Sequence, residues 1–288
     1  MNALTYASPG SVDEAVKLLA AADGNARLLA GGTDLLVQLR LGMIEPSLII
    51  DVKNISEMTA IKEENGGFRI GASISGAALG EHAGMQRAWP GVVEAVALIG
   101  STQIQGRATM GGNLCNASPA ADAVPAMIAA DALCTIAGPD GRREARVEEI
   151  VTGPGETSLE AFEMVVDFFF PARPARSGDA YLRFIPRTEM DIAVVGAGVS
   201  LTLDEAGVCT AARMALGAVA ATQLVVEDAA KALIGSTLDG AAMEKLDSAA
   251  RAACRPIDDK RGTIEHRTKV AGVLARRAAA IAKQRAEG

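Results

Sequence analysis

Apolar and polar positions alternate with different periods along the chain, and each period predicts an element. Ser11-Val-Asp-Glu14 has the S-x-x-E pattern of a capping box and predicts a helix over Val12–Ala22 with one apolar stripe. Short apolar runs predict strands at Arg27–Ala30 and Ser47–Ile50, and a helix is expected between them over Leu35–Leu41. This alternation predicts a small α/β unit.

A second unit is expected from residue 53 onward. Its clearest local signal is Gly138-Pro-Asp-Gly141, which predicts a hairpin between the strands Ala132–Ala137 and Arg142–Val147. Met164–Phe170 predicts an apolar strand that ends at Pro171. The remaining expectations are the strand Phe68–Gly71, a helix from Ser75, a helical stretch Trp89–Ile99 interrupted by Pro90, the polar segment Gly100–Asp122 and a helix over Val124–Ala130.

A third unit is expected after Pro171–Gly178, whose Pro, Arg and Gly content is typical of a linker. The expected elements there are the strands Ala180–Ile185, Ile192–Leu203 and Thr210–Leu216, and helices near Val226–Ile234 and Ile264–Gln284. The chain is therefore predicted to be an α+β protein in three parts, residues 1–52, 53–176 and 177–288.

Composition narrows the class of protein. Apolar residues make up 49% and charged residues 22% of the 288 positions, which favours a buried core over disorder. The longest run without charge, Ala108–Ala121, contains Gly, Asn and Pro, so no membrane span is expected. A net charge of −7 and 3% aromatic residues argue against nucleic-acid binding. The N-terminus has no basic region, and the charged residues Asp13 and Glu14 come early, so no signal peptide is expected.

The chain offers few residues for metal or acid–base chemistry. Its four cysteines are too far apart for a CxxC pair, which disfavours an iron–sulfur cluster or structural zinc and suggests a reducing, cytoplasmic location. Only two histidines are present, His82 and His266, and neither has a partner motif. Gly196-Ala-Gly198 lacks the rest of a dinucleotide fingerprint and is interpreted as strand packing. No catalytic residue or metal ligand is predicted.

Two glycine pairs are the candidate binding elements. Ala30-Gly-Gly-Thr-Asp34 follows a strand and precedes a helix, where backbone N–H groups can converge on an anion; the alternative is a plain capped turn. Thr109–Asp122 carries a second Gly-Gly and many short polar side chains without Lys or Glu, so it is expected to face a ligand rather than solvent. Two such turns could hold a dinucleotide pyrophosphate, and Asp122 suits a pair of ribose hydroxyls; a buried structural loop is the alternative.

Ala30–Asp34, Gln103–Asp122 and Arg187-Thr-Glu-Met-Asp-Ile-Ala193 together resemble the FAD-binding medium subunit of the molybdenum hydroxylases, the family of xanthine dehydrogenase and aerobic carbon monoxide dehydrogenase. The resemblance runs through the whole chain in order. It implies two FAD-binding subdomains of the vanillyl-alcohol-oxidase (PCMH) type, followed by a C-terminal α+β domain. The chain departs from the family pattern at Gln105-Gly106 and Met110, and both glycine pairs remain intact.

The resemblance also implies which residues bind FAD non-covalently. The pyrophosphate would lie at the two glycine turns, Asp122 would hold a ribose hydroxyl, Val165 would lie near the adenine, Arg183 would replace a lysine near the flavin, and Ile192 would lie against the isoalloxazine ring. The full expected set is Leu29, Ala30, Gly31, Gly32, Thr33, Asp34, Leu35, Gly100, Thr109, Met110, Gly111, Gly112, Asn113, Asp122, Val165, Arg183 and Ile192.

The implied function is electron transfer. FAD would receive electrons from a [2Fe-2S] small subunit, a molybdenum-cofactor large subunit would oxidise the substrate, and NAD, a quinone or oxygen would take the electrons. The alternatives are a self-contained FAD oxidoreductase of the same fold and a nucleotide-binding scaffold. The seven Lys/Arg residues of 261–288 would provide either a partner surface or a solvated helix face.

Overall fold

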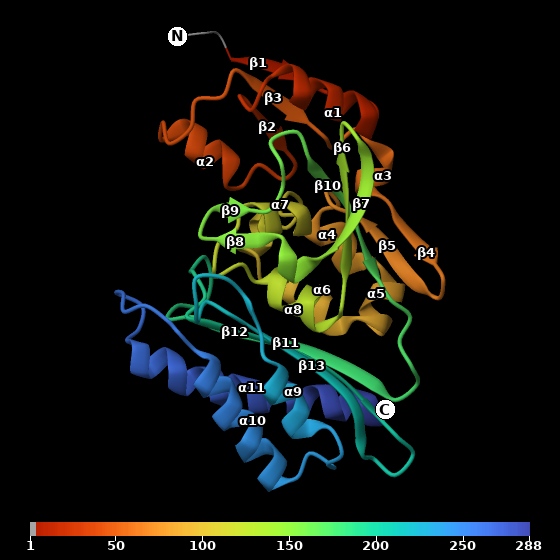
Figure 1. The fold of residues 1–288 in the computed structure, drawn as a ribbon, viewed down its shortest axis with the longest axis vertical. Coiled ribbons are helices and arrows are strands. Elements are labelled where there is room, and N and C mark those ends of the chain that lie inside the picture. Colours follow the sequence, from red (N-terminus) through yellow and green to blue (C-terminus); the bar gives the residue numbers. More distant parts are fainter. Residues whose placement is uncertain (1–3) are drawn as a thin grey trace.

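The computed structural model describes residues 4–288 and shows three stacked parts along the longest axis of the molecule (Figure 1). Residues 4–51 form one end, a five-stranded sheet with helices forms the middle, and a four-stranded sheet with long helices forms the other end. One core of buried side chains fills the first two parts, and a second core fills the last. Within residues 4–288, no helix is long and apolar enough to cross a membrane.

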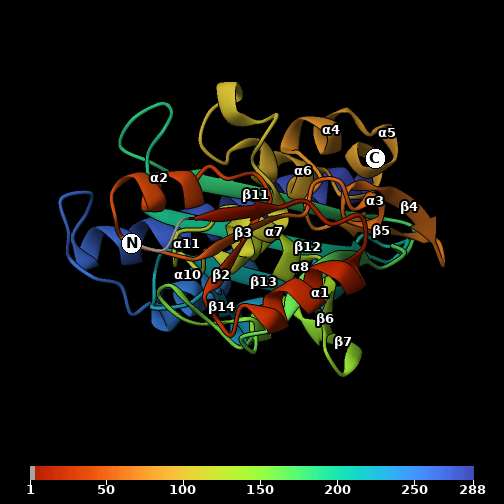
Figure 2. The same cartoon turned by 90° about the horizontal axis from the view of Figure 1, so that it is seen from above.

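The first part is a three-stranded parallel sheet with strand order β1-β3-β2. In Figure 2, α1 and α2 lie on either side of this sheet. Ser11 caps α1 by accepting the N–H of Glu14, as the sequence predicts, and the Glu14 carboxylate accepts from Gly10 rather than from Ser11. The elements are β1 (Thr5–Ala7), α1 (Val12–Ala21), β2 (Ala26–Leu29), α2 (Leu35–Arg40) and β3 (Leu48–Asp51).

The middle part is built on an antiparallel sheet with strand order β4-β5-β10-β6-β7. The expected hairpin is present: Gly138 pairs with Gly141, which has a φ of +115°, and Pro139-Asp140 form the turn. Its strands are β4 (Ile61–Glu64), β5 (Gly67–Gly71), β6 (Leu133–Gly138), β7 (Gly141–Arg146) and β10 (Met164–Phe170), with the small pair β8 (Val151–Gly153) and β9 (Glu156–Thr157) beside it.

Short helices fill the rest of the middle part. Pro90 occupies the first turn of α6 and so begins this helix instead of interrupting it, because the missing N–H of proline costs nothing there. The segment Gly100–Asp122, expected as a polar loop, contains two short helices. The helices are α3 (Ser56–Thr59), α4 (Gly76–Glu81), α5 (Ala83–Ala88), α6 (Pro90–Ala97), η1 (Thr102–Ile104), α7 (Met110–Cys115), α8 (Ala123–Ala129) and η2 (Val147–Glu149).

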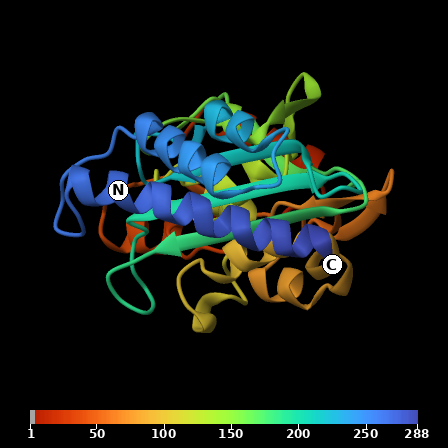
Figure 3. The same cartoon turned by 90° about the horizontal axis from the view of Figure 1, so that it is seen from below.

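The last part is an antiparallel sheet, β11-β12-β13-β14, with α9, α10 and α11 covering one face (Figure 3). On the opposite face α8 packs against β12 and β13. Gly198 permits this contact, because a Cβ there would lie 2.5 Å from the carbonyl oxygen of Pro125. The elements are β11 (Ser177–Phe184), β12 (Val195–Leu203), β13 (Cys209–Gly217), β14 (Leu224–Val225), α9 (Glu227–Leu233), α10 (Gly240–Ala253) and α11 (Ile264–Glu287).

The segment expected as a linker is pinned to both sides. The guanidinium of Arg173 lies 4.5 Å from the ring centre of Trp89 and donates to Asp179 at 2.9 Å. Only 11% of the Arg173 side chain and 4% of the Asp179 side chain are exposed. The connection between β10 and β11 is therefore anchored by the buried Arg173–Asp179 pair, although Ala172, Pro174, Ala175 and Arg176 are exposed.

Candidate functional site

A cleft of about 370 Å³ lies between the first two parts, a volume in the range of small-molecule sites. It is lined by both glycine turns, by residues of α1, β2 and α2, and by the segment from Thr157 to Val165. Gln38 of α2 donates to Asn116, which follows α7, at 3.2 Å, so one hydrogen bond crosses the cleft. The fold therefore brings together cleft walls that are more than a hundred residues apart in the sequence.

The first glycine turn links β2 to α2. Gly32 has a φ of +79°, a conformation that side chains other than glycine rarely adopt. Gly31 packs against the chain just before the second turn: a Cβ on Gly31 would lie 2.1 Å from the carbonyl oxygen of Arg107. The first turn therefore packs against the chain that leads into the second turn, and both turns line the same cleft. Asp34 forms no capping hydrogen bond to α2, and burial raises the pKa of its carboxyl.

The second glycine turn opens α7. Thr109 caps this helix by accepting the N–H of Gly112 at 3.0 Å. Gly111 donates its N–H to the Ala72 carbonyl at 3.0 Å and lies so close that a Cβ would be 2.6 Å from that oxygen. Gly112 faces open space apart from the hydroxyl of Thr109. The absence of a side chain at Gly111 thus allows α7 to pack against Ala72, whereas its absence at Gly112 leaves the cleft open.

Eleven of the residues expected to bind the cofactor line the cleft, and six do not. Those that line it are Ala30, Gly31, Gly32, Thr33, Asp34, Leu35, Thr109, Gly111, Gly112, Asn113 and Val165. Outside the lining are Leu29, Gly100, Met110, Asp122, Arg183 and Ile192, and Met110, the first residue of α7, is fully buried. Sequence reasoning did not find Arg27, Gln38, Ile99 or the segment 157–164, whose lining role arises only from the fold.

Asp122 lies between the middle and last parts. Its carboxylate accepts from the Tyr181 hydroxyl at 2.9 Å and from Arg183 at 2.7 Å. Burial raises the pKa of Asp122 to about 6, although Arg183 and Tyr181 act to lower it. The N–H of Ala123 donates to Asn113, which ties this end of α8 to the cleft. Asp122 itself therefore does not line the cleft, but the next residue, Ala123, is hydrogen-bonded to Asn113, which does.

Comparison with known proteins identifies this arrangement. A model of the FAD binding domain in molybdopterin dehydrogenase matches residues 2–173, and one of the CO dehydrogenase flavoprotein C-terminal domain matches residues 180–282. The chain belongs to the FAD-binding medium subunits of the molybdenum hydroxylases. The family, the FAD-binding fold with its C-terminal domain, the oxidoreductase class and the FAD cofactor expected from the sequence are thereby confirmed.

The similarity covers nearly the whole chain. The carbon monoxide dehydrogenase medium chain of Afipia carboxidovorans is 34% identical over 98% of this chain and 97% of its own. The xanthine dehydrogenase FAD-binding subunit of Escherichia coli O157:H7 is 32% identical over 91% of this chain and 90% of its own. Among solved structures, the Cu,Mo-CO dehydrogenase superposes with a TM-score of 0.94 at 34% identity, covering 98% of both chains. Quinoline 2-oxidoreductase from Pseudomonas putida 86 gives 0.91 at 28% identity, covering 99% of both.

Proposed function

We propose that the chain binds one FAD non-covalently in the cleft, with the pyrophosphate at the two glycine turns. The observation that carries this proposal is that Gly31–Thr33 and Gly112–Asn113 line one cleft, with Gly31 packed against Arg107 just before the second turn. The backbone of such turns presents N–H groups to an anion. Val165 lines the same cleft beside a bulge in β10 and is proposed to lie near the adenine.

The flavin end of the cofactor is proposed to extend toward the C-terminal part. Among the residues outside the cleft lining, Gly100, Arg183 and Ile192 are proposed to lie beside this end. Asp122 is proposed to hold a ribose hydroxyl, and Leu29 and Met110 are proposed to support the glycine turns at the pyrophosphate. Two contacts support that direction. Ile99 lines the cleft next to Gly100, and Asn113 connects the cleft to the helix that follows Asp122. Each oxygen of Asp122 keeps a second lone pair that a cofactor hydroxyl could use.

Within a complex, the chain is proposed to carry electrons between partner subunits and an acceptor. Bound FAD supplies the redox chemistry, and the protein supplies binding, orientation and electrostatics. The electron donor is proposed to be a [2Fe-2S] small subunit that is reduced by a molybdenum-cofactor large subunit, and the acceptor to be NAD, a quinone or oxygen. The names of the relatives, which are medium chains and FAD subunits of dehydrogenases, support this division of labour.

Domain boundaries and location are also proposals. The proposed parts 1–52, 53–176 and 177–288 are supported by the three larger sheets, one in each part, and by the two cores, the first of which spans two parts. A cytoplasmic location is supported by the four cysteines, all of which are free thiols. Three of them, Cys134, Cys209 and Cys254, are buried, so reduction is compatible with the fold.

The test begins with the chain purified alone and loaded with FAD. Acid denaturation should release a yellow compound with the mass of FAD in a 1:1 ratio to protein. Flavin that stays with the denatured protein would contradict non-covalent binding, and absence of flavin would contradict the function. Aldehydes, heterocycles and carbon monoxide should not bleach the flavin anaerobically without partner subunits. Rapid bleaching by the isolated chain would instead favour a self-contained oxidoreductase.

A further inference from the structure

The hydroxyl of Ser73 is a buried polar group that lines the cleft without a partner. Only 6% of Ser73 is exposed, and its Oγ atom makes no hydrogen bond within residues 4–288. A buried hydroxyl that is left unpaired costs free energy, so native structures rarely contain one. An acceptor on a bound ligand would satisfy it. Ser73 is not among the residues that the family resemblance implies for FAD.

An unpaired hydroxyl in the cleft is unusual for this chain. Seven buried side-chain atoms of residues 4–288 lack a partner, and five of them belong to side chains that bond through another atom: Glu148, Arg173, Gln223, Arg251 and Arg267. The sixth is Nε1 of Trp89, which does not line the cleft. In the part of the chain that the structure describes, Ser73 is thus the one cleft-lining residue with such an atom.

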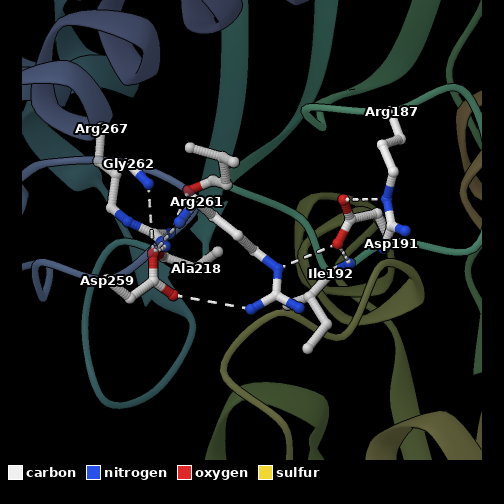
Figure 4. Close-up of polar contacts among 9 residues, drawn as sticks. Arg187, Asp191, Ile192, Ala218, Asp259, Arg261, Gly262 and Arg267 are labelled. Atoms are coloured by element: carbon white, nitrogen blue, oxygen red, sulfur yellow. Dashed lines mark hydrogen bonds and ion pairs between the residues drawn. The ribbon is translucent and has the colours of Figure 1, made fainter.

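Polar groups away from the cleft show how the chain satisfies its own side chains (Figure 4). Arg267, which is 4% exposed, donates to Asp259 at 2.8 Å. The carboxylate of Asp191 accepts from Arg187 and from Arg261, at 3.0 Å each. These contacts need no ligand, so the unpaired hydroxyl of Ser73 is a feature of the cleft and not of the fold in general.

Ser73 lies beside the second glycine turn. The carbonyl oxygen of its neighbour, Ala72, accepts the N–H of Gly111 at 3.0 Å. The N–H of Ser73 itself donates at 2.8 Å to the carbonyl oxygen of Met58, which also lines the cleft. The backbone around Ser73 is therefore fixed by hydrogen bonds, and its hydroxyl is held close to the turn that is proposed to bind the pyrophosphate.

The cleft offers few positive charges to an anion. Among the described residues that line it, Arg27 is the one basic side chain, whereas Asp34, Glu160 and Glu163 are acidic. Arg27 also donates to two nearby carbonyl oxygens of the chain. A pyrophosphate in this cleft must therefore be held largely by uncharged donors, and a serine hydroxyl is such a donor.

We propose that the Ser73 hydroxyl donates a hydrogen bond to the pyrophosphate of bound FAD. The contact adds a side-chain donor, from the chain just after β5, to the backbone N–H groups of the two glycine turns. It rests on the proposed binding of FAD in the cleft. Since the acceptor is charged, loss of this bond should weaken FAD binding about tenfold or more.

Ser73→Ala removes the hydroxyl and adds no volume. The dissociation constant for FAD, measured by quenching of flavin fluorescence, should rise about tenfold or more. The cofactor-free variant should unfold at the same urea concentration as the parent or at a higher one, because it no longer buries an unpaired hydroxyl. Weaker FAD binding together with a clear loss of stability would show that the hydroxyl is structural, which overturns the proposal.

Ser75→Ala is the matched control from the same segment. The Ser75 hydroxyl caps α4 by accepting the N–H of Ala78 at 3.2 Å, and Ser75 does not line the cleft. This variant should lose stability, as expected for a lost cap, and should keep the dissociation constant of the parent for FAD. The two serines should thus respond in opposite ways. An equal weakening of FAD binding in both variants would overturn a specific role of Ser73.

ADP tests which part of the cofactor the hydroxyl meets, because ADP has the pyrophosphate and lacks the flavin. Titration calorimetry should show ADP binding weakened by Ser73→Ala by a factor similar to that for FAD. A change for FAD alone would place the hydroxyl at the flavin and overturn the pyrophosphate contact. Unchanged binding of FAD and ADP would overturn the contact while the proposed function stands. If neither the parent nor Ser75→Ala binds FAD, the proposed function fails and the contact fails with it.

Discussion

Asp122 and Arg183 form a buried ion pair at 2.7 Å that joins the FAD-binding part to the C-terminal part. Their side chains are 9% and 7% exposed, and Tyr181 donates to the other oxygen of Asp122. The sequence suggested a ribose ligand at Asp122, whereas the structure shows its carboxylate in the contact between two parts. Any cofactor contact of Asp122 is therefore shared with an interdomain pair, and its titration affects the stability of the whole chain.

Asp122→Asn should have a pH-dependent effect on the unfolding of the cofactor-free chain. The folded pKa of Asp122, about 6, lies above the ordinary 3.8, so the folded state holds this proton more tightly. Stability from this group is present below pH 4 and is lost as the pH rises through 6. Asparagine does not titrate. The stability advantage of the parent over Asp122→Asn should therefore shrink by on the order of 2 kcal/mol between pH 4 and 7, measured by urea unfolding.

Asp191→Asn provides a control, because the pKa of Asp191 is shifted in the opposite direction from that of Asp122. The pKa of Asp191 is lowered, so its stabilising contribution is lost only as the pH falls below the ordinary carboxyl range. Between pH 4 and 7 its stability difference from the parent should stay constant. An Asp122→Asn difference that is constant or that grows over the same range would show that the raised pKa is wrong.

The adjacent glycines of the second turn should fail in different ways when substituted. A Cβ on Gly111 meets the backbone of Ala72, so Gly111→Ala should destabilise the chain by about 1–3 kcal/mol through overpacking. A side chain on Gly112 meets only the Thr109 hydroxyl and otherwise extends into open space of the cleft. Gly112→Val should therefore lose FAD while the chain still unfolds cooperatively at a similar urea concentration. Full FAD content in Gly112→Val would remove this turn from the pyrophosphate site.

Local signals explain what the sequence could predict. The β6–β7 hairpin follows from Gly138-Pro-Asp-Gly141, and β10 follows from seven residues of near-continuous apolar character. Missed elements lack such signals. The polar strand β4 forms because β5 offers it an edge to pair with. In α10, only Ala242, Leu246 and Ala250 are buried, so its apolar stripe is narrow. The helix α7 contains two glycines, yet it forms because Thr109 caps it and Met110 and Leu114 are buried.

The candidate site divides in the same way. Both glycine turns are local and could be found in the sequence. Arg27, Gln38 and Leu159 line the cleft only because β2, α2 and the segment before β10 converge in space, which no spacing rule encodes. The basic residues of 261–288 show the same limit: Arg267 and Arg285 bind groups within the chain, so the excess of positive charge there does not by itself mark a partner surface.

Cys115 should report on cofactor occupancy. It is the exposed one of the four cysteines and lies among the residues that line the cleft, and desolvation of the sulfur by the surrounding cleft walls raises the pKa of its thiol. Alkylation by a maleimide at mildly alkaline pH should be slow and should slow further in proportion to the fraction of chain that holds FAD. Cys115→Ser gives the background. Alkylation of Cys115 at an unchanged rate under saturating FAD would mean that the cofactor does not cover this part of the cleft.

Arg173→Ala should be strongly destabilising because it leaves the Asp179 carboxylate buried without its partner. Arg173 also donates to the Ala88 carbonyl and packs over Trp89, so three contacts at the junction are lost together. Arg285 still donates to the Asp179 carbonyl oxygen at 2.8 Å, and its charge only partly compensates. The expected loss at pH 7 is about 3 kcal/mol or more in urea unfolding.

Adding Asp179→Asn to Arg173→Ala separates the effect of the buried Asp179 charge from the effect of lost packing over Trp89. Burial raises the pKa of Asp179 to about 6, so its charged form is already disfavoured in the folded state. Removing that charge from Arg173→Ala should restore roughly 1–2 kcal/mol at pH 7, although the contacts of Arg173 with Trp89 and Ala88 stay lost. The single variant should regain stability as the pH falls, because Asp179 then takes up a proton, and it should do so at a higher pH than the parent, since Arg173 no longer lowers the pKa of Asp179. A double variant as unstable as Arg173→Ala at pH 7 would show that packing over Trp89, and not the buried charge, holds the junction together.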